Sequence, residues 1–419
     1  MAALSLVIFV IILILAFNRK VNMGVLAFAV ALILGRLIGL TDKEIVKTLS
    51  ASLFVTLTGI TMLFTAVNET GALKLISERI VSLIGKRIWL LPMVVYVVGF
   101  TLAAIGPGAI PPTALVVTLA VTSAISVGYN PIMMSIIGTF GGVGARVCAY
   151  TPEGVLVSTL AAEQGISSGV ILPVFAFQVI TTILGAIIVF FVFKGHKVKP
   201  TETELVAEKT KATKQQIIAL LAVLAMLVMV VIFRFDIGLT SFLLSALLFL
   251  FKVVDDRATI KSVPWGTIVM ILGVGVLMNV VSKAGGIDLL CSLLSNVMNE
   301  NTVAPFTGVT AGIMSLVSSG FGVVYPTLIP MASDLCASVG GGEPVAVIAA
   351  IVAGGSLVGL SPMSTCGALT LSTMSSLQPM NKEESNKAFM TLFVVALCAI
   401  VWTGVCGALF GNLCVALFG

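Results

Sequence analysis

The chain has 419 residues, of which 58% are hydrophobic and only 10% are charged. A soluble globular protein carries about 25% charged residues, so this composition argues against a large soluble enzyme and indicates an integral membrane protein. Because each helical span needs about 20 apolar residues, the length allows about ten crossings and no separate soluble domain. The net charge of +5 does not indicate a nucleic-acid partner, since the cations cluster in loops beside apolar segments.

The first half of the chain consists of apolar segments followed by a long uncharged run. Residues 2–17, 21–40 and 48–68 are apolar enough to be membrane spans, and a short amphipathic segment follows at 71–87. The run 88–145 then contains no charge over 58 residues. As one helix, at about 1.5 Å per residue, it would far exceed a hydrocarbon core of about 30 Å, so the chain must turn within it.

The turn is predicted at the glycines and prolines of residues 106–112, because proline lacks an N–H and clashes with the preceding helical turn. We expect a hairpin over residues 88–128 and a helix over 131–162 that is interrupted at Thr151-Pro152. The hairpin is either re-entrant or crosses the membrane with both arms. The re-entrant form is favoured, because the break falls in mid-run with no charge at its tip.

The second half of the chain repeats the first at an offset of 214 residues. The matched pairs include Gly24 and Gly238, Gly59 and Gly273, Gly106 and Gly320, Gly108 and Gly322, Pro112 and Pro326, and Thr113 and Thr327. One gap-free offset that aligns glycines, prolines and loop charges indicates an internal repeat. The offset then shrinks slightly, and a second pair of motifs appears: Gly141-Gly142 with Thr151-Pro152, and Gly354-Gly355 with Ser361-Pro362.

The predicted fold is an all-α polytopic membrane protein of two inverted-topology repeats, each with about five spans, a re-entrant hairpin and an interrupted helix. The first repeat covers residues 1–193, the linker covers 194–214, and the second repeat covers 215–419. Within the second repeat we expect a hairpin at 302–338 and an interrupted helix at 344–376. Matching helix breaks at membrane depth in two halves point to a transporter with a binding site near the midplane.

The distribution of Lys and Arg predicts the orientation in the membrane. If the linker 194–214 is cytoplasmic, 17 of these residues lie inside and five lie outside. Each half then has an odd number of crossings, which makes the repeats inverted. We therefore expect a multi-pass protein of the plasma membrane, specifically a bacterial inner membrane, with the central linker in the cytoplasm.

One ionisable pair lies within the first interrupted helix. Arg146 precedes the break, and Glu153 directly follows Pro152. A charge at this depth is costly and faces a cavity or a partner. Arg146 either presents its guanidinium to a substrate carboxylate or forms a structural ion pair with Glu153. The chain has no phosphate-binding loop and one histidine, His196 in the linker, so we expect no cofactor and no transition-metal site.

The hairpins and the second break supply few polar side chains, so the backbone is expected to contribute much of the binding. The hydroxyls there belong to Thr113, Ser318, Ser319, Tyr325, Thr327, Ser361, Ser364 and Thr365. Singly, such hydroxyls often bond to the preceding helical turn, but as a cluster at symmetric breaks they favour contact with a ligand. Carbonyls opened at Thr151-Pro152 suit a small cation, and N–H groups near Gly108 and Gly322 suit an anion.

These motifs resemble a known group of membrane proteins. The sequence Glu69-Thr70-Gly71-Ala72-Leu73, the tip Gly106-Pro107-Gly108-Ala109 and the Gly-Gly then Thr-Pro helix, repeated in the second half, look like the ion transporter superfamily. The likeness is greatest to its malonate/dicarboxylate carrier (MatC-like) branch, which is related to divalent anion/sodium symporters. It implies a homodimer in the lipid bilayer, with a scaffold domain and a mobile domain that carries substrate like an elevator.

Symporters of this kind bind carboxylate through Ser-Asn-Thr at each hairpin tip, whereas this chain has Gly106-Pro107-Gly108 and Ser318-Ser319-Gly320. This departure makes Arg146 a more attractive anion ligand. The substrate-binding set that the motifs and the resemblance imply is Gly106, Pro107, Gly108, Ala109, Thr113, Arg146, Thr151, Pro152, Ser318, Ser319, Gly320, Thr327, Ser361, Pro362 and Thr365. Two sodium sites are implied, one framed by Gly106, Gly108, Gly141, Gly142 and Thr151, the other by Ser318, Ser319, Gly355, Ser361 and Thr365.

The leading hypothesis is a secondary symporter that moves a small carboxylate, such as the dicarboxylates malonate, malate or succinate, with a sodium or proton gradient. One alternative is the large membrane subunit of a tripartite carrier that depends on a binding protein. Another, cation/proton antiport, lacks the expected buried acids. An intramembrane enzyme is not expected, because no H-E-x-x-H zinc pair or Ser/His arrangement is present.

Overall fold

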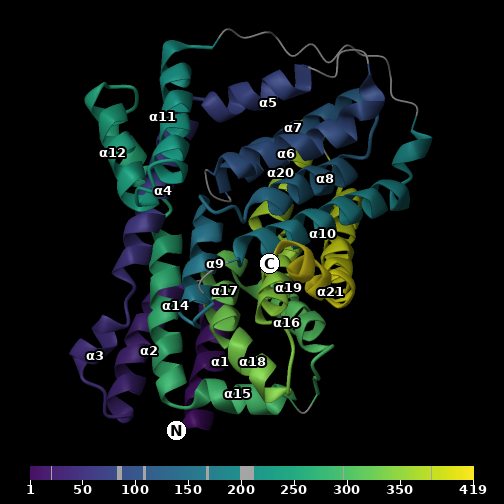
Figure 1. Ribbon diagram of the computed structural model, residues 1–419. Helices are drawn as coiled ribbons and strands as arrows, with labels where there is room; N and C mark the ends of the chain where they lie inside the picture. Colours follow the sequence, from purple (N-terminus) through teal and green to yellow (C-terminus); the bar gives the residue numbers. More distant parts are fainter. Residues whose placement is uncertain are drawn as a thin grey trace.

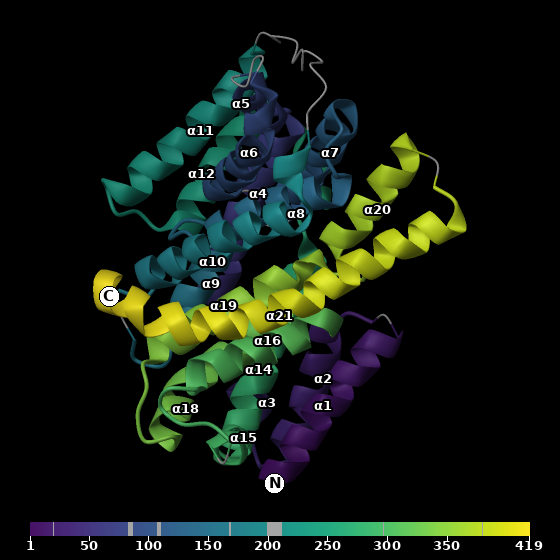
Figure 2. The same cartoon turned by 90° about the vertical axis from the view of Figure 1, so that its right-hand side faces the viewer.

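The computed structural model describes the chain except for residues 20, 83–86, 107–109, 167–168, 199–211, 296 and 379. All regular elements in this described part are helices (Figures 1 and 2). Six of them are long and apolar enough to cross a membrane. The predicted all-α, multi-pass fold class is therefore confirmed.

The first half contains ten α-helices among its described residues. They are α1 (Ala2–Arg19), α2 (Met23–Leu37), α3 (Asp42–Lys47), α4 (Ala51–Glu69), α5 (Ala72–Ser82), α6 (Leu91–Ile105), α7 (Ile110–Val127), α8 (Pro131–Ala145), α9 (Pro152–Ala162) and α10 (Ile171–Val192). The hairpin predicted at 88–128 corresponds to α6 and α7, and the interrupted helix predicted at 131–162 corresponds to α8 and α9. The first break therefore spans residues 146–151.

The second half has the same order of elements. Its helices are α11 (Lys214–Val231), α12 (Ile237–Leu250), α13 (Asp256–Ser262), α14 (Trp265–Lys283), α15 (Gly286–Ser295), α16 (Val303–Val317), α17 (Tyr325–Leu328), α18 (Ala332–Ser338), α19 (Pro344–Leu357), α20 (Thr365–Leu377) and α21 (Lys382–Phe418). The return arm of this second hairpin is broken into a π-helical turn at Gly320–Val324, α17, a 3₁₀ turn and α18. Pro326 and Pro330 lie in this arm, and each removes a backbone donor from the helical ladder.

Equivalent helices of the two halves make equivalent contacts. Helix α2 packs on α14, and α12 packs on α4. The first crossing places Gly273 against the backbone of Gly24, and the second places Gly59 against the backbone of Gly238. Helix α5 lies at the upper end of the molecule in Figures 1 and 2 and α15 at the lower end. If the repeats are inverted, the equivalent helices α5 and α15 must lie at opposite ends of the molecule, as they do here. The inversion of the repeats relative to a membrane stays a prediction.

Each hairpin packs against the interrupted helix of its own half. Helix α6 lies along α8, and α16 lies along α19. Glycines allow the close approach: a Cβ at Gly141 would overlap the carbonyl of Tyr96, and a Cβ at Gly354 would overlap the carbonyl of Gly308. This packing brings the hairpin ends beside the helix breaks.

The last helix, α21, is a single helix of 37 residues. At about 1.5 Å per residue it is about 55 Å long, which is well above the thickness of a hydrocarbon core of about 30 Å. It begins six residues before the apolar segment that starts at Ala388, because Asn381 and Glu384 form a capping box at its N-terminus. It runs obliquely across α10, α16 and α19 and ties the second half to the first (Figure 2).

Candidate functional site

A cavity of about 430 Å³ lies where the hairpins meet the two helix breaks. Its lining on one side comes from α4 and from the junction between α13 and α14. The other side is formed by α6, α7 and α16 of the hairpins, by α8 and α19, and by the first turns of α9 and α20. Elements of both halves therefore build one cavity, and the cavity contains both breaks.

Arg146 and Glu153 are the only charged residues among the described residues that line this cavity. They face each other across the first break, and Nη2 of Arg146 donates to Oε1 of Glu153 at 2.7 Å. The Glu153 side chain is 1% exposed and that of Arg146 is 18% exposed. The Nε of Arg146 is buried and has no hydrogen-bond partner among the described residues. The ion pair therefore forms, and the guanidinium retains donor capacity that no described residue uses.

Thr151 holds the first break in shape through its hydroxyl. Its Oγ1 donates to the carbonyls of Arg146 at 2.6 Å and Cys148 at 2.9 Å, and accepts from the N–H of Gly154 at 3.1 Å. This is an N-cap for α9, which satisfies a donor that the first helical turn leaves free. The hydroxyl is buried and committed to backbone groups.

Ser364 plays the same part at the second break, 213 positions later. Its Oγ donates to the carbonyls of Gly359 and Ser361 and accepts from the N–H of Gly367, so it caps α20. The expectation that Ser361-Pro362 matches Thr151-Pro152 is wrong, because Ser361 occupies the place of Cys148 in this arrangement. The motif was misaligned because both dipeptides place a hydroxyl before proline.

Helix ends of opposite polarity meet in this cavity. Three helix N-termini line the cavity. They are the first turns of α9 and α20, and the first turn of α7 through Pro112 and Thr113. The C-terminal ends of α8 and α19 line it through residues such as Gly142 and Gly355. N-terminal ends carry partial positive charge and favour anions, whereas C-terminal carbonyls favour cations. The cavity thus offers backbone partners for both signs of charge.

The tip of the second hairpin lies directly against the second interrupted helix. Ser318 donates to the carbonyl of Met314 at 2.7 Å, and Ser319 accepts from the N–H of Gly322 at 3.0 Å. Gly320 packs so closely on the backbone of Gly355 that a Cβ would overlap its carbonyl. Both serine hydroxyls are thus engaged with local backbone, although the residues line the cavity.

Most of the sequence-predicted site residues that the structure describes meet in the cavity. Those that line it are Thr113, Gly142, Arg146, Thr151, Pro152, Ser318, Ser319, Gly320, Gly355 and Thr365. Those that do not line it are Gly106, Gly141, Thr327, Ser361 and Pro362. Pro107, Gly108 and Ala109 fall outside the described residues.

Three of the five residues outside the cavity have surroundings that the structure defines. Gly141 packs under the carbonyl of Tyr96, and Gly106 has a left-handed φ of 100° beside the ring of Phe64. Thr327 is buried, and its hydroxyl has no hydrogen-bond partner in the described structure. Of the described residues of the first predicted sodium site, only Gly142 and Thr151 line the cavity. Both sodium sites stay predictions.

Sequence reasoning missed the wall that α4 and α14 contribute. Thr61 and Thr65 of α4 and Thr267 of α14 line the cavity. Thr61 and Thr65 are four residues apart and so lie on one helix face. That spacing was the available signal, but such hydroxyls also occur in ordinary spans, where they bond to the preceding turn, as Thr61 does to Leu57 at 2.6 Å.

Two serines that line the cavity were also missed. Ser315 donates to the carbonyl of Gly355 at 2.8 Å, and Ser356 donates to the carbonyl of Val352 at 2.7 Å. The hydroxyl of Tyr325 lies 2.5 Å from that of Ser356. These contacts fix the second hairpin on α19, so they support the cavity wall.

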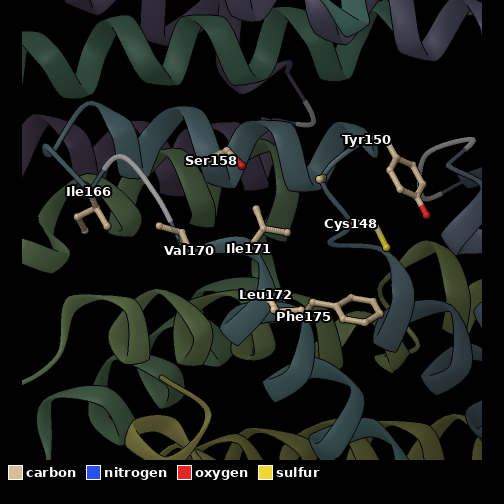
Figure 3. Close-up of a pocket in the computed structure, with 10 residues that line it drawn as sticks. Cys148, Tyr150, Ser158, Ile166, Val170, Ile171, Leu172 and Phe175 are labelled. Atoms are coloured by element: carbon tan, nitrogen blue, oxygen red, sulfur yellow. The ribbon is translucent and has the colours of Figure 1, made fainter. Parts of the chain in front are cut away.

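A second cavity, of about 560 Å³, is lined in part by residues of the first break (Figure 3). Its lining is mostly apolar, with Ile166 at one end and Tyr150 and Cys148 at the other. The break contributes to both cavities, since Cys148, Ala149 and Tyr150 line this cavity whereas Arg146 lines the polar one. None of the described residues that line the apolar cavity is charged, so it offers little to an anion, and the polar cavity is the candidate site.

Comparison with known proteins supports a membrane carrier. Residues 1–146 match the family model described as the dicarboxylate carrier protein MatC N-terminus. The resemblance to the dicarboxylate carrier branch is therefore confirmed over this part of the chain. No curated protein matches the sequence.

Two solved transporters have a similar fold. MtrF of Neisseria gonorrhoeae, described as illuminating a class of antimetabolite efflux pumps, aligns with a TM-score of 0.60 at 12% identity, over 90% of this chain and 84% of its own. The YdaH transporter of Alcanivorax borkumensis aligns with a TM-score of 0.57 at 14% identity, over 93% of this chain and 96% of its own. At these identities the likeness concerns the fold. Together with the family match, it indicates a multi-pass membrane transporter rather than an enzyme.

Proposed function

We propose that the protein is a secondary transporter that binds a small carboxylate, of the dicarboxylate class represented by malonate, malate and succinate, in the polar cavity. The observation that carries the proposal is the guanidinium of Arg146, the only cationic side chain in the described lining. Guanidinium presents its donors in a fork that suits a carboxylate. The family match over residues 1–146 supports the same class of substrate.

The helix ends support binding of an anion together with a cation. The first turns of α9 and α20 add partial positive charge beside Arg146, at a place where few side-chain donors are free. Carbonyls at the ends of α8 and α19 supply oxygen ligands of the kind that a small cation uses in transporters with broken helices. We propose coupling to sodium or protons, and an elevator motion of a homodimer in which the hairpins and interrupted helices move against α4 and α14.

The test is uptake into proteoliposomes that contain the purified protein alone. Labelled malonate, malate and succinate are offered with and without an imposed sodium gradient, and then with a proton gradient. Saturable uptake that a gradient stimulates supports the proposal. Absence of uptake of all three acids under both gradients contradicts a self-sufficient carboxylate carrier.

The role of Arg146 is tested by Arg146→Gln in the same assay. A charge-assisted hydrogen bond contributes about 1.5–3 kcal/mol, so the variant should raise the KM for the carboxylate at least about tenfold. Arg36→Gln is the matched control, because Arg36 is exposed and pairs with Asp42 away from the cavity. An unchanged KM in Arg146→Gln would show that the carboxylate binds elsewhere.

A further inference from the structure

We infer that Glu153 is the counter-ion of the empty carrier, and that it allows the substrate-free protein to change between its inward-facing and outward-facing forms. The inference rests on the proposed carrier function. It starts from the 2.7 Å ion pair between Glu153 and Arg146, both of which line the cavity. Glu153 thus neutralises the guanidinium of Arg146, as a bound substrate carboxylate would.

Burial makes this pairing necessary. The Glu153 side chain is 1% exposed, and the Nε of Arg146 is shielded from solvent with no partner in the described part of the chain. Removing one partner of a buried ion pair leaves an uncompensated charge in a medium of low dielectric constant, which is strongly unfavourable. A segment that carries such a charge cannot cross apolar surroundings at the rate of a neutral one.

No other described group around the cavity can replace Glu153 as an anion. In the internal repeat, Gly359 stands at the position that matches Arg146, and Cys366 stands at the position that matches Glu153. The second half therefore supplies no equivalent ion pair. Tyr325 lies near the guanidinium, but its hydroxyl is held by Ser356 at 2.5 Å and by the carbonyl of Val352 at 3.1 Å. The charge of Arg146 is therefore balanced by Glu153 alone until a carboxylate arrives.

This assignment separates two transport modes. Exchange of external for internal substrate never requires the empty carrier to change form, whereas net uptake requires it in every cycle. In Glu153→Gln the substrate still neutralises Arg146 when it is bound, so exchange should continue. Net uptake should fall at least about tenfold, because the empty carrier would hold a lone buried charge. Glu153→Asp keeps the charge and should retain net uptake.

The deciding experiment contains no substrate. Cys366 lines the cavity at the position that matches Glu153, and it serves as the probe in a chain whose other six cysteines are replaced. A membrane-impermeant thiosulfonate is applied to right-side-out and to inside-out vesicles. With Glu153 intact we expect labelling from both sides. With Glu153→Gln we expect labelling from one side to slow at least about tenfold.

A double variant separates charge balance from a structural role. Arg146→Gln alone also leaves one buried charge and should likewise restrict labelling to one side. The combination Arg146→Gln with Glu153→Gln leaves none and should restore labelling from both sides, which a merely structural role does not predict. Two-sided labelling of Glu153→Gln at the rate of its parent, or no restoration in the double variant, overturns the inference. Absence of carboxylate uptake by the wild type would overturn the proposed substrate alone, since the labelling needs none.

Discussion

Gly273 of α14 packs against Gly24 of α2 so closely that a Cβ on Gly273 would overlap the carbonyl of Gly24. Gly59 of α4 stands in the same relation to Gly238 of α12. The 214-residue offset carries Gly24 onto Gly238 and Gly59 onto Gly273, so one helix crossing is built twice. Both crossings position the helices that form one wall of the cavity.

Replacing Gly273 with Ala should destabilise the protein, because the added methyl has no room and forces α2 and α14 apart. Overpacking of this kind costs about 1–3 kcal/mol. Gly275→Ala is a matched control on the same helix, since a Cβ there meets nothing within 4 Å and alanine is the better helix former. Thermal unfolding of the purified proteins in detergent should show a lower Tm for Gly273→Ala only. Equal Tm values in the two variants would mean that the crossing is loosely packed.

The two hydroxyl caps should contribute similar amounts to stability, since Thr151 and Ser364 make matching hydrogen bonds. Thr151→Val keeps the shape of the side chain but removes the acceptor for the N–H of Gly154. We expect a loss of about 1 kcal/mol in unfolding free energy for Thr151→Val and for Ser364→Ala. Thr151→Ser retains the hydroxyl and should be near the wild type. A Thr151→Val protein with wild-type stability would contradict the capping role.

Gln164 should hold the first interrupted helix to the second hairpin. Its Nε2 donates to the carbonyl of Ile329 at 2.7 Å, and its Oε1 accepts from the N–H of Ser333 at 2.9 Å. Each such bond contributes about 1 kcal/mol, so Gln164→Ala should speed amide hydrogen exchange around residue 333 about fivefold or more. Gln164→Glu keeps the acceptor and loses the donor, so its exchange rate around residue 333 should lie between those of the wild type and Gln164→Ala. Unchanged exchange in Gln164→Ala would indicate that packing alone joins these segments.

Modification of Cys366 should block transport. Its side chain lines the polar cavity of about 430 Å³, so a covalent adduct would occupy volume that the substrate needs. A variant with Cys366 as its only cysteine should lose at least about 90% of uptake after reaction with a small thiosulfonate, and bound carboxylate should slow the reaction. The control retains only Cys398, which lies exposed on the last helix. Full uptake by the labelled Cys366 protein would place the substrate elsewhere.

The sequence predicted the backbone plan because that plan depends on glycine and proline. The spacing between Gly106 and Pro112 forces a turn in an uncharged run, and the constant offset to Gly320 reports the same turn in the other half. Arg146 was identified because a lone charge in an apolar run requires a partner. Glu153, the nearest carboxylate in sequence, is that partner in the structure.

The rest depended on tertiary packing. Whether Thr61 faces the cavity is decided by how α4 crosses α14, and the sequence of α4 does not specify this. The second break was misaligned because Ser361-Pro362 resembles Thr151-Pro152, whereas the matching cap is Ser364. Hydrogen bonds to the backbone define Thr151 and Ser364 as equivalent caps. The spacing from Ser364 to Gly367 equals that from Thr151 to Gly154.

The ion pair occurs in one half only, and Gly359 and Cys366 stand at the matching positions of the other. If the halves were chemically identical, exchanging their conformations would convert one end state into the other without a change in free energy. Here the exchange brings the charges of Arg146 and Glu153 against different neighbours. The proposed alternating-access mechanism therefore implies two end states of unequal free energy. The unloaded protein would then favour one side of the membrane, and substrate offered from that side would meet a larger fraction of molecules that are open to it.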